Sequence, residues 1–132
     1  MGKPLKVLAV DDDFINLKLI SSMLKKNQNV VQIIEAKNGL EALNSLKEQP
    51  DTNLVLLDIK MPVMDGIEFL NNLESMESLK KIPVIVLTTD ESKKHEAFDH
   101  GAVDFLVKPI REHDLNAKIS KIAELLEKFC LF

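Results

Sequence analysis

Carboxylates, hydroxyls and one ammonium group directly follow four short apolar runs of this chain. The residues after "KVLAV" (6–10), "NLVLL" (53–57), "PVIVL" (83–87) and "VDFLV" (103–107) are, in order, Asp11, Asp12, Asp13, Asp58, Thr88, Thr89 and Lys108. Neighbouring carboxylates raise each other's pKa unless a cation neutralises them, and Mg²⁺ prefers such oxygen ligands together with phosphate. A lysine can grip an anion and a hydroxyl can donate to it. Together these groups could place a phosphoryl group on Asp58.

Each of these residues also has an ordinary structural explanation. The run Asp11–Asp13 could cap a helix, a threonine ending a strand is often a packing residue, and a Lys-Pro pair is often a loop. An acid at the end of a buried strand is costly, however, unless water or a cation reaches it. Because all of these groups follow strand-like runs, a common site explains them better than separate structural roles.

Strand-like and helix-like segments alternate along the whole chain. Apolar runs predict strands at 6–10, 30–35, 53–57, 83–87 and 103–107, and helical patterns predict helices at 14–26, 38–48, 66–76, 91–100 and 111–128. Asn38 and Glu41 have the spacing of a capping box, Asp90 is placed as an N-cap, and His100-Gly101 as a helix end. This alternation predicts an α/β fold with a parallel sheet covered on both faces. Ligands of such folds lie beyond the carboxyl ends of the strands.

The composition excludes several classes of protein. The 132 residues fit one domain, and a net charge of -4 with dispersed basic residues argues against a nucleic-acid surface. The single cysteine, Cys130, cannot form an internal disulfide, which fits a reducing compartment. No run approaches the ~20 apolar residues of a membrane helix, and the N-terminus is no signal peptide. We therefore expect one cytoplasmic domain, 1–132, that binds neither membrane nor nucleic acid.

Four motifs resemble those of the receiver (response-regulator) domains of two-component signalling. They are "VDDD" (10–13), "DIKMPVMDG" (58–66), "VLTT" (86–89) and "GAVDFLVKP" (101–109), and the resemblance runs from Lys6 to about Lys128. The four motifs together are far more specific than any one of them. The resemblance implies the (βα)₅ fold of the chemotaxis receiver, a doubly wound parallel five-stranded sheet with the flavodoxin-like order 2-1-3-4-5.

The resemblance also implies an acceptor and a metal site. Asp58 matches the phosphoacceptor, and Asp11 and Asp12 match the acidic pair that holds Mg²⁺, with Mn²⁺ as the alternative metal. The metal in this family also takes Asp58 itself and a backbone carbonyl two residues later, which is that of Lys60. Asp13 is expected to cap the following helix instead.

Further residues match contacts to the phosphoryl group and its control. Thr88 matches the hydroxyl that moves onto the phosphoryl group, Lys108 the lysine that contacts it, and Phe105 the aromatic switch residue. Lys60 and Asp90 are expected to tune the lifetime of the phosphoryl group by controlling the access of water.

Three residues around the site have a structural interpretation. Gly66 is expected to allow a backbone geometry denied to other residues, and Pro62 to set φ in the loop beneath Asp58. Pro109 follows Lys108 as the family pattern requires. Met61 and Met64 are expected to pack rather than react.

The implied function is signalling and not catalysis on an external substrate. Asp58 would take a phosphoryl group from a phosphohistidine of a sensor histidine kinase or a histidine phosphotransfer protein, and the domain would catalyse only its own phosphorylation and dephosphorylation. Phosphorylation would shift the face formed by 91–100, 103–107 and 111–128 toward a downstream target protein. We expect a monomer or a weak phosphorylation-dependent dimer, either as a stand-alone receiver or as one excised from a longer protein.

Other functions fit fewer of these residues. In a haloacid-dehalogenase-like phosphatase, Asp11-x-Asp13 would form the nucleophile motif, but Phe14-Ile15 depart from its pattern and Asp58 would have no role. A flavin-binding electron carrier is disfavoured because the chain has no Trp or Tyr to stack on the ring. A receiver that only binds partners is disfavoured because all of the expected site residues are present.

Two apolar segments exceed what a simple core requires. The helix expected at 14–26 has more apolar residues than one face buries, so either its core face is unusually wide or Phe14 or Leu17 forms a docking patch for a histidine-bearing helical bundle. The tail "KFCLF" (128–132) either folds onto the core or binds a partner. The histidines, which lie in predicted helices away from the strand ends, are expected at the surface: His95, His100 and His113.

Overall fold

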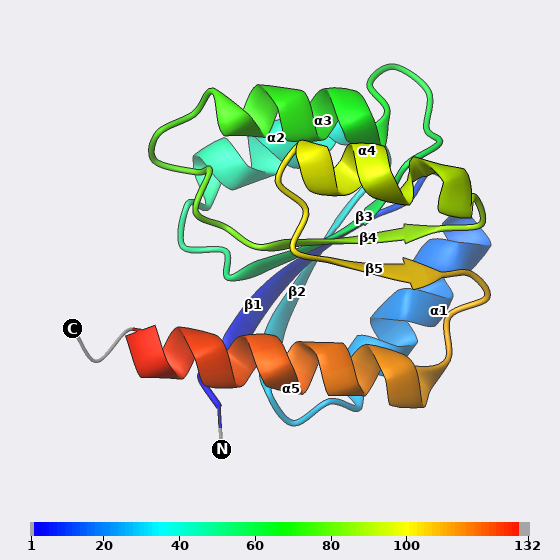
Figure 1. Cartoon of the computed structure of the whole chain (residues 1–132). Helices are drawn as coiled ribbons and strands as arrows, with labels where there is room; N and C mark the ends of the chain where they lie inside the picture. Colours follow the sequence, from blue (N-terminus) through cyan, green and yellow to red (C-terminus); the bar gives the residue numbers. More distant parts are fainter. Residues whose placement is uncertain (1, 130–132) are drawn as a thin grey trace.

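Strands and helices alternate in the order predicted from the sequence. The computed structural model describes residues 2–129 (Figure 1). The strands are β1 (Leu5–Val10), β2 (Val30–Ala36), β3 (Leu54–Asp58), β4 (Val84–Thr88) and β5 (Asp104–Val107). The helices are α1 (Phe14–Lys25), α2 (Gly39–Glu48), α3 (Gly66–Glu74), a 3₁₀ turn η1 (Glu91–Lys93) that leads into α4 (Lys94–Asp99), and α5 (Glu112–Phe129).

The strands form one parallel sheet in the order β2-β1-β3-β4-β5, which confirms the predicted flavodoxin-like topology. Helices α2, α3 and α4 cover one face of the sheet, and α1 and α5 cover the other (Figure 1). β1 and β3 are neighbours in the middle of the sheet, and Val10 pairs with Leu57 at their carboxyl ends. The residues that follow these two strands, Asp11 and Asp58, therefore lie next to each other.

Side chains of the central strands alternate between two buried layers. In β3, Val55 and Leu57 pack with α2 and α3, whereas Leu54 and Leu56 pack with α1 and α5, and all four are fully buried. Burying one such side chain contributes about 2 kcal/mol, so an uninterrupted apolar strand stabilises both layers at once. This double burial fixes the strand, and with it the position of the acid that ends it.

Polar side chains determine where three helices begin. Asp13 caps α1, as predicted, by accepting hydrogen bonds from two amides of its first turn. Asn38 caps α2 through the amide of Glu41, but the Glu41 carboxylate accepts from the amide of Lys37 and not from that of Asn38. The predicted capping box at α2 is therefore only half formed. A complete reciprocal box occurs at α3, where Asp65 is the cap.

The structure corrects two details of the sequence analysis. Phe14 is 65% exposed, but Leu17 is buried in the core, so Phe14 alone of these two is available for a surface patch. The predicted helix 91–100 begins as a 3₁₀ turn capped by Asp90, and its helical part ends at Asp99, shortly before Gly101 with φ 97°.

Two of the three histidines lie at the surface of the domain. His95 and His113 are exposed as predicted, whereas His100 is half-buried and its Nδ1 lies 2.9 Å from Glu74 Oε1. Cys130 and the rest of the tail at 130–132 lie outside the described residues. Among residues 2–129, the structure contains no helix with the length and apolarity needed to cross a membrane.

Candidate functional site

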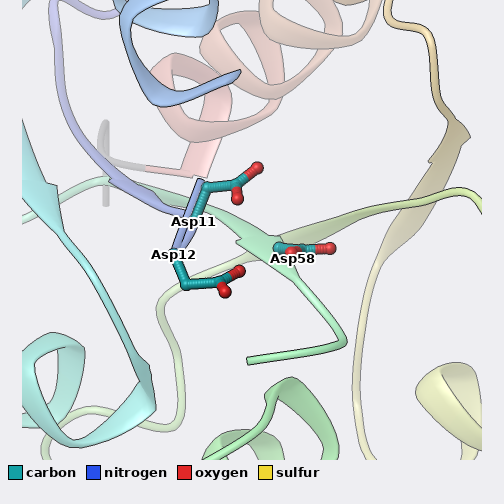
Figure 2. Close-up of side chains that lie close together, drawn as sticks. All are labelled: Asp11, Asp12 and Asp58. Carbon is teal, nitrogen blue, oxygen red and sulfur yellow. The ribbon is translucent and has the colours of Figure 1, made fainter. Parts of the chain in front are cut away.

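Three carboxylates meet at the carboxyl edge of the sheet. Asp11 and Asp12 follow β1, Asp58 ends β3, and one carboxylate oxygen of each lies within 4.8 Å of the other two. Figure 2 shows the three side chains together at the ends of their strands. Asp11 and Asp58 are 1% and 7% exposed, whereas Asp12 faces solvent. The cluster thus has a buried floor and one side open to water.

Lys108 bridges the two buried carboxylates. Its Nζ donates to Asp11 Oδ2 at 2.7 Å and lies 3.4 Å from Asp58 Oδ1. Its backbone amide donates to the carbonyl of Thr88 at 2.8 Å, which ties the residue after β5 to the end of β4. A single ammonium cannot neutralise three neighbouring carboxylates, so the cluster retains negative charge that attracts a further cation.

Burial raises the pKa of Asp58 to about 6. The loss of hydration is the main cause; the charge of Lys108 opposes it and the charge of Asp11 adds to it. The Ile59 amide donates to Asp58 Oδ1 at 2.9 Å and favours the ionised form. Burial lowers the pKa of Lys108, but its contacts with Asp11 and Asp58 outweigh this and the net change is upward. At pH 7 to 8, Asp58 is therefore largely an anion beside a cation, which is the state a carboxylate nucleophile needs.

Thr88 and Phe105 belong to the neighbouring strands β4 and β5, which lie on the side of β3 opposite to β1. Thr88 is 1% exposed at the end of β4, and its Oγ1 accepts a hydrogen bond from the amide of Asp90 at 3.2 Å. Phe105, paired with Val86 across β4 and β5, is buried in the core that contacts α4. The hydroxyl thus stands at the sheet edge, while the aromatic ring points into the core.

Lys60 and Asp90 face each other from the loops that follow β3 and β4. Lys60 Nζ lies 4.0 Å from Asp90 Oδ2, and the Lys60 side chain is largely exposed. The hydroxyl and amide of Ser92 hydrogen-bond to Asp90 and lower its pKa, and Lys60 lowers it further. Lys60 and Asp90 thus form a loose ion pair between the loops that follow the strands of Asp58 and Thr88.

The loop after β3 packs tightly against the strand end it leaves. A Cβ on Gly66 would lie 2.5 Å from the carbonyl oxygen of Asp58 and 2.8 Å from Ile59 Cα. The amide of Gly66 donates to the carbonyl of Ile59 at 2.8 Å, which closes the base of the loop. Only Gly101 among the described glycines has a positive φ. The predicted reason for Gly66 was therefore wrong: its place requires the absence of a side chain and not an unusual backbone conformation.

Val63, at the tip of the same loop, was missed by the sequence analysis. Its φ is 69°, and the Met64 amide donates to the Pro62 carbonyl at 2.7 Å, so Val63 is the central residue of a γ-turn. A β-branched residue in the left-handed region is a genuine outlier, and the conformation costs roughly 1–2 kcal/mol. No sequence signal predicts it, because turn residues with positive φ are normally Gly, Asn or Asp.

The donor set of the acidic cluster fits Mg²⁺. Oxygens on opposite sides of one Mg²⁺ lie about 4.2 Å apart, since each Mg–O bond is about 2.1 Å. Only one pair among three such ligands can be opposite, and adjacent oxygens lie about 3.0 Å apart. The oxygens of Asp11, Asp12 and Asp58, which lie within 4.8 Å of one another, would therefore draw closer together around the ion. Asp13 is engaged as the cap of α1 and does not join the cluster. This also weakens the phosphatase alternative, whose motif requires Asp13 at the reaction centre.

The structure thus defines an α/β domain with a doubly wound five-stranded sheet and an acidic cluster at its carboxyl edge, and known proteins match it. Residues 7–120 match the family model of the response regulator receiver domain. The two-component response regulator ORR11 of Oryza sativa subsp. indica is 32% identical over 123 residues, which span 92% of this chain and 82% of that protein. The chain therefore belongs to the response regulator receiver domain family.

Solved structures agree with this assignment. The chemotaxis protein CheY4 of Vibrio cholerae, crystallised at low pH, has a TM-score of 0.81 and 31% identity, over 89% of this chain and 98% of that one. The receiver domain of the sensor histidine kinase PA1611 of Pseudomonas aeruginosa, solved with magnesium in its active site cleft, has a TM-score of 0.82 over 90% of this chain and 97% of that one. At 23% identity, this second likeness is one of fold.

Proposed function

We propose that Asp58 accepts a phosphoryl group from the phosphohistidine of a sensor histidine kinase or a histidine phosphotransfer protein. The observation that carries the proposal is a carboxylate at the end of β3, with its pKa raised to about 6, between a buried ammonium and two further carboxylates. Membership in the receiver family supports it, because phosphorylation by such donors is the function of receiver domains. Asp58 is the acceptor we favour because it is the member of the cluster that ends the central strand β3.

In this reaction one oxygen of Asp58 attacks phosphorus in line with the bond to the donor imidazole. The P–N bond breaks, its electron pair stays on the imidazole nitrogen, and an acyl phosphate forms on Asp58. Lys108, 3.4 Å from Asp58 and 2.7 Å from Asp11, is held where it can pair with a phosphoryl oxygen. Mg²⁺, held by Asp11, Asp12, Asp58 and the Lys60 carbonyl, would neutralise charge that develops on the phosphoryl oxygens. Mn²⁺ would serve the same purpose.

Phosphorylation would act on α4, β5 and α5 through two residues. The hydroxyl of Thr88 is free to leave its bond with the Asp90 amide, a 3.2 Å contact, and to donate to a phosphoryl oxygen. Movement at the end of β4 would open or close space for the ring of Phe105 on the neighbouring strand. We propose that this biases a two-state equilibrium of the face read by a downstream target protein, and that the Lys60–Asp90 pair tunes hydrolysis by screening water.

Intact-mass measurement tests the acceptor. Incubation with Mg²⁺ and acetyl phosphate is expected to add about 80 Da, one phosphoryl group, to the unsubstituted chain and to the control Asp51→Asn. Asp51 is an exposed acid far from the cluster, paired with Lys6. Asp58→Asn should show no adduct. An adduct that persists in Asp58→Asn but disappears in Asp11→Asn would contradict the proposal and restore the phosphatase alternative.

We propose that the protein donor docks on α1. Phe14, Ile15 and Leu19 are 65%, 65% and 55% exposed on this helix, close in sequence to the metal-site acids. Leu19 also lines a pocket of about 100 Å³ between α1 and the loop after β5, and Lys108 and Pro109 line the same pocket. Since Lys108 also contacts Asp58, a helical bundle seated on this apolar surface would bring a phosphohistidine to the acceptor.

Substitution of Leu19 separates docking from chemistry. Leu19→Asp is expected to slow phosphorylation by a histidine phosphotransfer domain roughly tenfold or more, because a charge in an apolar contact typically removes at least 1.4 kcal/mol of binding. Labelling by acetyl phosphate, which needs no docking surface, should be slowed much less. The matched control is Leu125→Asp on α5, where Leu125 is 42% exposed. Equal slowing by both substitutions, measured as phosphotransfer rates with the same donor, would contradict docking on α1.

Several wider properties belong to the same proposal. We propose that 1–132 acts as a single receiver domain in the cytoplasm, with no catalysis beyond its own phosphorylation and dephosphorylation. It would work as a monomer or as a weak dimer that forms on phosphorylation. Its partners would be proteins, since the net charge of -4 disfavours a nucleic-acid surface.

A further inference from the structure

The loop between β3 and α3 is held in its present shape by three backbone hydrogen bonds. The Gly66 amide donates to the Ile59 carbonyl at 2.8 Å, and the Met64 amide donates to the Pro62 carbonyl at 2.7 Å. The Met64 carbonyl in turn accepts from the amide of Gly39, the first residue of α2, at 2.9 Å. These bonds fold 60–64 back over the end of β3, so they also determine where the carbonyl of Lys60 lies.

Contacts of Met64 show how closely the loop is pressed against α2. A Cβ on Gly39 would lie 2.7 Å from the Met64 carbonyl oxygen and 2.8 Å from its Cγ. Because Gly39 has no side chain, Met64 can come close to the start of α2, and the hydrogen bond from the Gly39 amide to the Met64 carbonyl holds it there. The loop therefore has a well-defined closed form in which its tip is clamped between the end of β3 and the start of α2.

Val63 opposes this closed form. It is the one non-glycine residue of the described chain with a positive φ, and its side chain is 74% exposed. Its strain is therefore not offset by burial in the core. Glycine or asparagine would adopt the same conformation with less strain and without exposing an apolar side chain. Residues held in such conformations cluster at functional sites, where the strain affects a local equilibrium.

We propose that Val63 is a positioning residue that keeps the closed, metal-ready form of the β3–α3 loop only partly populated and thereby weakens Mg²⁺ binding. In the open form Val63 returns to an extended conformation, and the amides of Met64 and Gly39 turn to water. Because Mg²⁺ needs the Lys60 carbonyl in its closed position, its apparent affinity is reduced in proportion to the closed fraction. This inference rests on the metal site of the proposed function and adds a residue that regulates it.

Substitutions graded by their preference for positive φ test the inference. The measurements are the Kd of Mg²⁺ by calorimetry, and the exchange rates of the Met64 and Gly39 amides without metal. Val63→Asn and Val63→Gly are expected to bind Mg²⁺ roughly two- to fivefold more tightly and also to slow the exchange of both amides, with the product of the two factors limited to roughly 5–30 by the 1–2 kcal/mol of relieved strain. Val63→Ile, which is equally β-branched, should leave both quantities unchanged. The control is Val31→Asn in β2, where Val31 is 68% exposed and has no positive φ.

The outcomes distinguish this inference from the proposed function. If Val63→Asn and Val63→Gly raise the melting temperature but leave the Kd of Mg²⁺ and the two exchange rates unchanged, the strain has only a structural effect and the inference is wrong. If the unsubstituted chain binds no Mg²⁺, or binds it equally after Asp12→Asn, the proposed metal site fails and the inference fails with it. Equal gains in Val63→Asn and Val63→Ile would also overturn it, because they would not follow backbone preference.

Discussion

Replacing Asp58 by Asn is expected to make the metal-free protein more stable at pH 7.5, by about 2–3 kcal/mol. The carboxylate of Asp58 is buried, which raises its pKa from 3.8 to about 6. Between these two values the folded state holds a proton that the unfolded state has released. Stability therefore falls as pH rises from about 4 to 6, and it remains reduced at higher pH. Asparagine keeps the oxygen that accepts from the Ile59 amide and removes the buried charge.

Denaturation curves in EDTA from pH 4 to 8 measure this effect as the difference between the two proteins. The free energies of unfolding should be similar near pH 4, diverge between pH 4 and 6, and differ by a nearly constant amount at higher pH. Mg²⁺ should stabilise the unsubstituted chain and narrow the gap. Asp51→Asn is a control of opposite sign, because the hydrogen bond from Lys6 lowers the pKa of Asp51 and its loss should destabilise the protein at neutral pH. A pH-independent difference between Asp58→Asn and the unsubstituted chain would show that burial does not raise the pKa of this carboxylate.

Gly66→Ala is expected to destabilise the protein by about 3 kcal/mol, at the upper end for overpacking. The added Cβ would lie 2.5 Å from the Asp58 carbonyl oxygen and 2.8 Å from Ile59 Cα. Both are backbone atoms at the end of a fully buried strand, so neither can rotate away as a side chain would. Either β3 or the start of α3 must shift, and the Gly66–Ile59 hydrogen bond that closes the loop must lengthen. Labelling by acetyl phosphate should fall as well, because the shift moves Asp58.

Gly101→Ala provides the comparison for this substitution. Gly101 has φ 97°, but nothing lies within 4 Å of where its Cβ would be, so its substitution incurs only the backbone cost of roughly 1–2 kcal/mol. Urea denaturation of both variants measures the difference. A loss in Gly66→Ala no larger than that in Gly101→Ala would mean that the strand end relaxes easily, and that the acceptor is less rigidly held than the contacts indicate.

The fold was predictable because its strongest signals are local and periodic. The runs that became β1, β3 and β4 are apolar on both faces, a pattern that predicts central parallel strands, and the structure buries them in both layers. The strand ends then followed from topology, which is why Asp11, Asp58 and Lys108 were expected to be neighbours. Their contacts agree with that expectation, while their roles in phosphorylation stay predictions.

What could not be predicted depends on contacts between elements. Helix α1 has apolar residues at adjacent positions, so the spacing of these residues alone did not show that the side chain of Leu17 is buried and that of Phe14 exposed. The requirement for Gly66 arises from the closeness of α3 to the end of β3, which no local pattern encodes. Val63 was missed for the opposite reason, because its residue type argues against the conformation that the loop imposes.

The bond from Lys108 to Asp11 joins residues 97 positions apart, the longest sequence separation of any side-chain hydrogen bond in 2–129. During synthesis from the N-terminus, the acids of β1 and β3 therefore emerge well before the ammonium that offsets their charge. Until β5 joins the sheet, Asp11 and Asp58 would be buried only at the expense of mutual repulsion. We expect the carboxyl edge to be among the last parts of the domain to become ordered, since its closure requires a side-chain contact between residues that lie far apart in the sequence. A nascent chain would therefore form most of its fold before Asp58 could be phosphorylated.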